Sequence, residues 1–134
     1  MTYKTKPIRV RYSDTDQMGY MHHSNYLRFF EIARLEWLSA LGVSYQKMEK
    51  EGVWLPVVSS DTQYKYPTFF DDELVVHVKL EKPPTAALLF TYIVNNQNDL
   101  LVCTGTTKLA FLDAARQRPI RCPKELFEVL NPLC

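Results

Sequence analysis

The sequence predicts an α+β fold in which an antiparallel five-stranded sheet wraps around one long central helix. Three observations predict this fold. Residues 24–41 carry apolar side chains at three- and four-residue spacing, four strand-like segments then follow in succession, and no other segment is long and apolar enough to cover a sheet. Strands grouped together, rather than alternating with helices, are typical of the α+β class.

The first strand is predicted within residues 6–12, before the helix. Ile8, Val10 and Tyr12 alternate with Arg9 and Arg11, which is the period of a strand with one buried face. We therefore expect this segment to lie at one side of the sheet.

The helix is predicted from Ser24 to Leu41, and Gly42 provides its end. Its polar stripe is narrow, so the sequence predicts a helix that is buried around most of its circumference. The apolar residues that set its period are Tyr26, Phe29, Phe30, Ala33, Trp37 and Leu41.

The remaining strands are predicted in residues 52–67, 72–82, 86–96 and 100–113. The first of them should bend near Pro56 and end at Pro67, because proline cannot donate a ladder hydrogen bond. A turn region is expected between Gly42 and this strand, and residues 122–132 predict a short C-terminal helix.

Composition indicates a single domain over residues 1–134. The formal charge is +1 and the one basic run is "ARQRPIR", so neither a nucleic-acid partner nor a membrane surface is expected. The N-terminus lacks the apolar region of a signal peptide and no segment approaches the ~20 apolar residues of a membrane span, so we expect a cytoplasmic protein. Cys103, Cys122 and Cys134 fit no disulfide or metal motif and are interpreted as reduced thiols, with Cys103 in the core.

The connection before the helix concentrates the chemically useful side chains. Asp14 and Asp16 are two residues apart, Gly19 follows, and His22 and His23 directly precede the helix. Taken singly, each has an ordinary explanation as a turn, cap or solvated loop residue. Together they place a carboxylate beside the unpaired N–H groups of a helix start, which can stabilise an oxyanion, and so predict an acyl-transfer site.

A metal site is the competing use of these side chains. Adjacent histidines in extended chain point in opposite directions, and His77 lies on a distant predicted strand, so no metal is expected. No "GxSxG" elbow, nucleophilic cysteine motif or glycine-rich phosphate loop is present. The loop carboxylates are therefore the best catalytic candidates.

The run "RYSDTDQMGYMHHSNYLRFFEIAR" resembles the signature of the 4-hydroxybenzoyl-CoA thioesterase family. Within that family it looks most like the small bacterial acyl-CoA thioesterases related to the Tol-Pal-associated enzyme. The resemblance implies the hotdog fold, an antiparallel sheet wrapped around one long helix. It also implies hydrolysis of an acyl-CoA thioester without a cofactor, since CoA is part of the substrate. The alternative is a non-catalytic module on the same fold that binds acyl-CoA or an acyl carrier.

The resemblance also implies roles for individual residues. Asp16 corresponds to the catalytic general base or nucleophile, and Asp14 to a structural residue. The backbone N–H of His23 would polarise the thioester carbonyl. The residues expected to shape the substrate pocket are Gly19, His22, Asn25 and Tyr26.

Departures from the family pattern concern the acyl group. His22 stands where relatives often have an aromatic residue, and Met18 stands where a small residue is common. Met18 would either narrow the acyl entrance or pack internally. Glu31 and Arg34 match the helical "E-x-A-R" and are interpreted as helix-surface or interface residues, with a substrate role as the alternative.

Two further expectations concern CoA and assembly. The cations proposed by composition alone for the CoA phosphates are Lys65, Lys108, Arg116, Arg118 and Arg121. The resemblance implies a homodimer or homotetramer with sites at the subunit interface. The apolar run "LLVCTGTTKLAFL" is predicted to need a partner strand rather than lie at an open edge.

Overall fold

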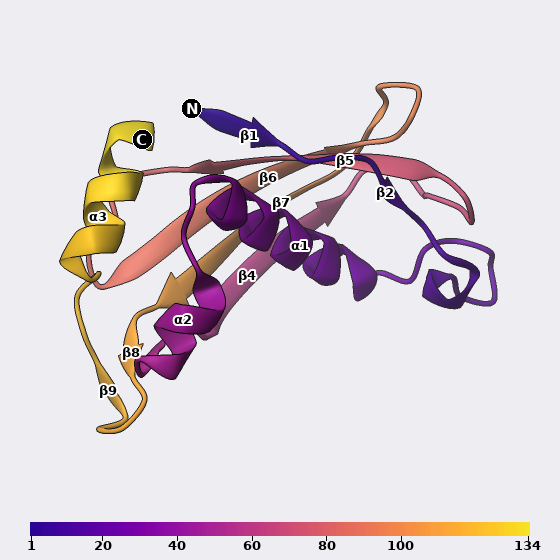
Figure 1. Ribbon diagram of the computed structural model, residues 1–134. Coiled ribbons are helices and arrows are strands. Elements are labelled where there is room, and N and C mark those ends of the chain that lie inside the picture. Colours follow the sequence, from indigo (N-terminus) through magenta and orange to yellow (C-terminus); the bar gives the residue numbers. More distant parts are fainter.

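The computed structural model describes residues 1–134, and its main feature is an antiparallel sheet with the strand order β1-β5-β6-β7-β4 (Figure 1). These strands are β1 (Thr2–Lys4), β4 (Val57–Tyr64), β5 (Glu73–Leu80), β6 (Ala87–Asn95) and β7 (Leu101–Ala110). A short β2 (Ile8–Arg9) also pairs with β5, further along the same edge as β1. The five predicted strand segments correspond to β2, β4, β5, β6 and β7, and β1 is a sixth strand that the sequence does not predict.

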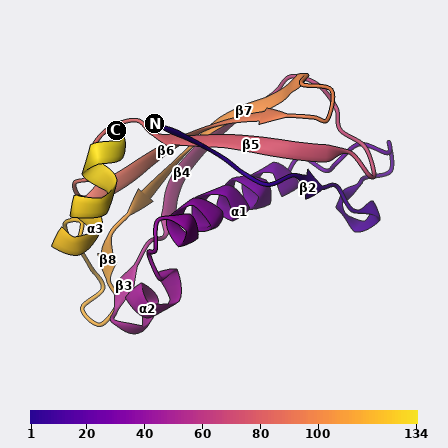
Figure 2. The ribbon, with the colours of Figure 1, turned by 45° about the horizontal axis from the view of Figure 1, so that its top comes forward.

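The long helix α1 (Asn25–Ala40) lies along one face of this sheet (Figure 2). Its buried side chains include Phe29, Phe30 and Trp37, and Phe30 stacks on Tyr92 of β6 with ring centroids 4.2 Å apart. Alternate residues of β5 and β6 are buried against the helix, as their period-two pattern predicts. The predicted α+β fold, with the sheet packed on one long helix, is confirmed.

The opposite face of α1 is more open than predicted. Leu27, Ile32 and Leu35 remain exposed, with 41% of the Leu27 surface accessible. The sheet covers one side of the helix only, so the expectation of burial around most of the circumference is wrong for the single chain.

Shorter elements complete the chain. The turn region expected after Gly42 contains a helix, α2 (Tyr45–Lys50), because the Ser44 hydroxyl caps it by accepting a hydrogen bond from the Lys47 N–H. The strand predicted to bend near Pro56 is divided there into β3 (Val53–Trp54) and β4. The remaining elements are β8 (Leu112–Asp113), β9 (Arg118–Pro119), the predicted C-terminal helix α3 (Lys124–Leu130) and the 3-10 turn η2 (Asn131–Leu133).

The first predicted strand is only partly correct. Its residues form β2 and then a 3-10 turn, η1 (Tyr12–Asp14), which takes Tyr12 out of the sheet and leaves it 78% exposed. The Asp14 carboxylate stabilises this turn by accepting a hydrogen bond from the Arg11 N–H at 2.9 Å.

β4 lies at an open edge of the sheet. The sequence analysis instead expected the run "LLVCTGTTKLAFL" to need a partner strand. The apolar run in residues 100–112 lies mostly in β7, which is paired on both sides by β6 and β4. Seven of the eight β4 residues are exposed, and that strand has no neighbour beyond it. The apolar character of β7 thus reflects burial inside the sheet.

Two other expectations concern the core and its cysteines. Cys103 is fully buried in the core cluster, as predicted, and all three cysteines are free thiols.

No helix has the length and apolarity that a membrane crossing requires.

Candidate active site

Asp16 opens a tight turn between η1 and α1. Its N–H donates to the Tyr20 carbonyl at 2.8 Å, and its own carbonyl accepts from the Gly19 N–H at 2.9 Å. Gly19 has a φ of +84°, a conformation that favours glycine. The carboxylate Oδ1 accepts from the N–H groups of Met18 and Tyr20 at 2.9 and 3.2 Å, whereas Oδ2 has no hydrogen-bond partner in the protein. The turn therefore fixes the carboxylate and leaves one oxygen free.

Asp14 has a different environment from Asp16. It is buried, and its Oδ1 accepts from Arg11 Nη2 at 3.2 Å. Its carbonyl accepts hydrogen bonds from the His22 N–H and from Asn25 Nδ2, both at 2.8 Å. These contacts join the loop to the first residue of α1, so Asp14 and Asn25 together set where the helix begins.

The N–H groups that lead into α1 are almost all paired. His22 donates to the Asp14 carbonyl, Ser24 to His22 Nδ1, Asn25 to the His22 carbonyl, and Tyr26 to the His23 carbonyl. Among residues 22–26, only the His23 N–H has no acceptor in the protein. A free N–H donor at the positive end of a helix can stabilise an oxyanion.

The two histidine rings do not point in opposite directions, as the sequence interpretation assumed. They stack with centroids 4.2 Å apart and planes 29° apart, because residues 23 and 24 form a turn rather than extended chain. His22 Nδ1 lies 2.8 Å from Ser24 Oγ and accepts from the Ser24 N–H at 3.2 Å. With Nδ1 as the acceptor of the Ser24 N–H, the Ser24 hydroxyl is the donor in the contact between Oγ and Nδ1.

A cleft of about 300 Å³ lies beside this turn, and it brings Asp16, His23 and Tyr26 together. Met18, at 71% exposure, lies on its rim and does not pack internally. Gly19, His22 and Asn25 do not line the cleft; they shape the backbone around it. The other lining residues are Tyr20, Met21, Tyr64, Lys65, Tyr66 and Pro67.

Aromatic side chains form much of the cleft wall. Tyr64 packs edge-on against Tyr26 and His23, with ring centroids 5.4 and 6.3 Å away. The Tyr26 hydroxyl lies 2.9 Å from Thr68 Oγ1, and burial raises the pKa of the Tyr26 phenol above its ordinary value although this hydrogen bond lowers it. Tyr26 is therefore a neutral, fixed wall residue.

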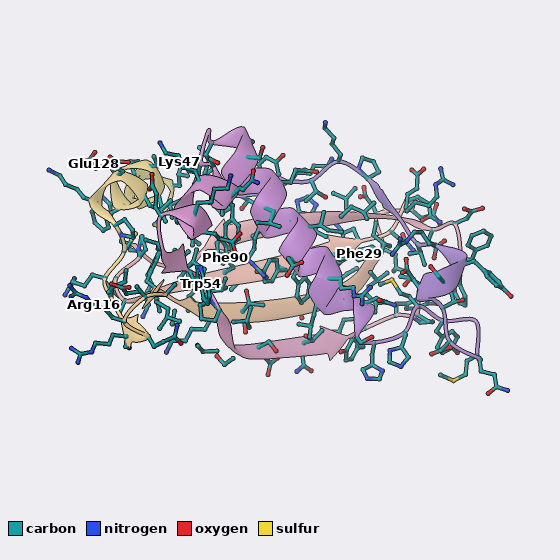
Figure 3. The ribbon with its side chains drawn as sticks, turned by 60° about the horizontal axis from the view of Figure 1, so that its bottom comes forward. Phe29, Lys47, Trp54, Phe90, Arg116 and Glu128 are labelled. Carbon is teal, nitrogen blue, oxygen red and sulfur yellow. The ribbon has the colours of Figure 1, made fainter.

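Sequence reasoning missed the contribution of Tyr64, Tyr66 and Pro67 to the cleft. Their signal was the run "YKYP", whose aromatic residues alternate past the end of β4 where Pro67 ends the strand pairing. Of the cations proposed for CoA, only Lys65 lines the cleft. Figure 3 shows Arg116 at one end of the molecule, away from Phe29 in the first half of α1.

Arg34 is not a surface residue, contrary to the sequence interpretation. It is 7% exposed and donates from Nη1 to the Tyr92 hydroxyl at 3.2 Å, inside the layer between α1 and the sheet. Glu31 is exposed on the helix surface, as predicted.

Metal ligands do not converge at this site. No group of three or more histidine, cysteine, aspartate or glutamate side chains is arranged to hold an ion. With one free carboxylate oxygen, Asp16 can take a proton or attack an electrophile held at the helix start.

Comparison with known proteins places the chain in a family. A family model described as "Thioesterase-like superfamily" matches residues 10–130. The chain belongs to the thioesterase-like superfamily. The resemblance seen in the sequence is thus confirmed at the superfamily level.

Individual members of the thioesterase-like superfamily match over nearly the whole chain. The acyl-CoA thioesterase YbgC of Haemophilus influenzae is 33% identical over 121 residues, which are 90% of this chain and 88% of that protein. A solved DHNA-CoA thioesterase from Staphylococcus aureus superposes with a TM-score of 0.91 at 34% identity, covering 96% of this chain and 87% of the other. A solved protein from Aquifex aeolicus has a TM-score of 0.87 at 36% identity, with 98% and 99% covered. The hotdog fold expected from the resemblance is confirmed.

Proposed function

We propose that this thioester hydrolase is an acyl-CoA thioesterase in which Asp16 is the general base or nucleophile and the His23 N–H binds the oxyanion. The observation that carries the proposal is the pair of unpaired groups at one cleft. Asp16 Oδ2 and the His23 N–H both lack protein partners, and both residues line the same 300 Å³ space. The names of the relatives, an acyl-CoA thioesterase and a DHNA-CoA thioesterase, support the same reaction class.

The proposed reaction has two routes with the same outcome. In the general-base route, Asp16 takes a proton from water while the water oxygen attacks the thioester carbon. In the nucleophilic route, Asp16 attacks that carbon and forms a mixed anhydride, which water then hydrolyses. In both, the carbonyl oxygen becomes an oxyanion that accepts from the His23 N–H, the C–S bond breaks, and CoA leaves as the thiolate and is then protonated. The products are the free acid and CoA.

The cleft supports further proposals about the substrate. The aromatic wall of Tyr26 and Tyr64 suits a planar or apolar acyl group. Membership of the 4-hydroxybenzoyl-CoA thioesterase family, near the Tol-Pal-related enzymes, stays a prediction from the sequence. Lys65, which lines the cleft, is the proposed partner of a CoA phosphate. A cytoplasmic location and the lack of a cofactor stay predictions from the sequence.

A homodimer through β4 is part of the proposal, and a tetramer built from such dimers is its extension. The exposed edge of β4 presents unpaired backbone groups and the apolar side chains of Val57 and Val58, which a second copy would cover. The strand ends at Tyr64, a cleft residue, so a partner at this edge would adjoin the site.

The test is a thiol-release assay of purified protein against short, long and aromatic acyl-CoAs. We expect turnover by the wild type and its loss in Asp16→Asn, with circular dichroism unchanged. Asp99→Asn is the matched control, because Asp99 is an exposed loop carboxylate whose left-handed backbone asparagine tolerates. Full activity of Asp16→Asn, or acyl-CoA binding without thiol release by the wild type, would overturn the assignment.

A further inference from the structure

A second cavity, separate from the Asp16 cleft, lies between α1, α2 and the sheet. Its volume is about 260 Å³, and it shares no lining residue with the Asp16 cleft. Seven of its ten lining residues are hydrophobic, and Figure 3 shows one of them, Phe90, on the face of the sheet that α1 covers. The other apolar walls include Leu35, Leu38, Leu55, Leu88 and Leu109.

The cavity contains one buried cation, Arg34. Its side chain is 8% exposed, and its one hydrogen bond within the protein goes from Nη1 to the Tyr92 hydroxyl. No buried side-chain nitrogen or oxygen lacks a partner, so Nε and Nη2 keep access to solvent. Arg34 lines the cavity, so a ligand in the cavity can reach the guanidinium.

The one counter-charge close to Arg34 is the Glu31 carboxylate, in a long and solvent-exposed ion pair. Burial raises the pKa of the Tyr92 phenol, although the neighbouring Arg34 lowers it, so Tyr92 is a neutral partner. The Glu31 carboxylate is 4.0 Å from Nη2, beyond hydrogen-bond distance, and its side chain is 64% exposed. A mostly buried guanidinium with free donors and only a long ion pair favours a bidentate carboxylate.

We propose that this cavity binds a small monocarboxylate with an aliphatic tail, its carboxylate on Arg34 and its tail among the leucines. The apolar walls match the tail, and the free Nε and Nη2 donors match the two carboxylate oxygens. Glu31 and Glu49 also line the cavity and repel an anion, so they limit the affinity. The site stands whether or not Asp16 is catalytic, because no residue is shared.

The experiment titrates octanoate, with octan-1-ol as the neutral match, into methyl-labelled protein followed by NMR. We expect octanoate to shift the methyl signals of Leu35 and Leu88. Its affinity should exceed that of octan-1-ol roughly tenfold or more, which is the gain expected from a charge-assisted hydrogen bond. Arg34→Gln keeps a donor for Tyr92 and should lose this preference, whereas Glu31→Gln should strengthen octanoate binding. Equal binding of acid and alcohol, or shifts confined to residues of the Asp16 cleft, would overturn the proposal.

A second pair of variants keeps the proposal testable if Arg34→Gln does not fold. Leu35 lines the cavity and is 37% exposed, so Leu35→Trp should fill the space with little loss of stability. Leu27→Trp is the matched control, because Leu27 is 41% exposed on the same helix and does not line the cavity. Octanoate should bind the Leu27 variant and not the Leu35 variant, and equal binding to both would reject the site. Asp16→Asn should bind octanoate as the wild type does, which separates this site from product bound at the Asp16 cleft.

Discussion

Gly105 of β7 lies directly under the ring of Phe30 on α1. A Cβ built on Gly105 would be 2.5 Å from Phe30 Cε2 and 2.6 Å from Cζ, far inside van der Waals contact. The absence of a side chain at this one position lets the helix approach the sheet and lets Phe30 stack on Tyr92. The close approach therefore depends on this pair.

Gly105→Ala should destabilise the protein by about 1–3 kcal/mol, the usual cost of overpacking a core. The added methyl group must displace a ring that is fully buried and stacked on Tyr92. Urea unfolding measures the change. In a Phe30→Leu background, adding Gly105→Ala should cost less stability than it does in the wild type, because leucine leaves room for the methyl group. Equal losses in the two backgrounds would show that the contact is not the cause.

His22 is predicted to act as a positioning residue through its ring nitrogen. His22→Leu removes the acceptor of the Ser24 N–H, and loss of such a cap costs about 1 kcal/mol. Because the freed turn carries the His23 N–H, kcat should fall more than KM rises. His22→Asn, which keeps an acceptor near the position of Nδ1, should recover most of kcat. Steady-state kinetics of the two variants check this, and equal kcat values would contradict it.

Much of the fold is predictable because its signals are local. The period-two patterns of β5 and β6 and the helical spacing in residues 24–41 arise from burial against each other, and each was identified correctly. The edge of the sheet was not predictable in this way. β7 is apolar because it is internal and β4 is mixed because it is an edge, and pairing order is a property of the whole chain rather than of one segment.

In the candidate site, too, the features that come from one continuous segment were predictable and those that depend on distant segments were not. The sequence brought Asp16 and His23 together because they lie in one loop before one helix, and the structure places both at one cleft. Residues 64–67 come from a segment some 40 positions away, and nothing in a single sequence indicates that this strand ends beside the loop. Arg34 was misplaced because a charged residue in a helix is usually exposed, and its partner Tyr92 lies on a distant strand.

The open edge of β4 predicts a dimer that a single charged substitution on this strand should dissociate. Val58→Glu places a carboxylate at the exposed edge, where two copies would bring like charges together, so we expect a shift from dimer to monomer. Light scattering coupled to gel filtration measures the mass. Ile93→Glu is the control, because Ile93 is 49% exposed on an internal strand and its variant should remain at least dimeric. A monomeric wild type would refute the assembly.

Cys103 predicts a loss of stability at alkaline pH. Burial raises the pKa of its thiol from 9.0 to about 12, so above pH 9 the unfolded chain releases a proton that the folded chain keeps. The folded state then binds more protons than the unfolded state, and the free energy of unfolding falls as the pH rises from 9 to 12. For one thiol the loss is about 1.4 kcal/mol between pH 8 and pH 10.

Urea unfolding of wild type and Cys103→Ala at several pH values isolates this contribution. Tyr92 also has a raised pKa and contributes a loss of the same sign, but it is present in both proteins and its contribution cancels in the difference. Cys103 is one cause of the raised pKa of Tyr26, so that part of the Tyr26 contribution disappears together with the thiol. Cys103→Ala leaves a small cavity and should be less stable at pH 8, yet it should lose less stability on going to pH 10. Parallel pH profiles for the two proteins would show that the Cys103 thiol ionises equally readily in the folded and unfolded states, contrary to its burial.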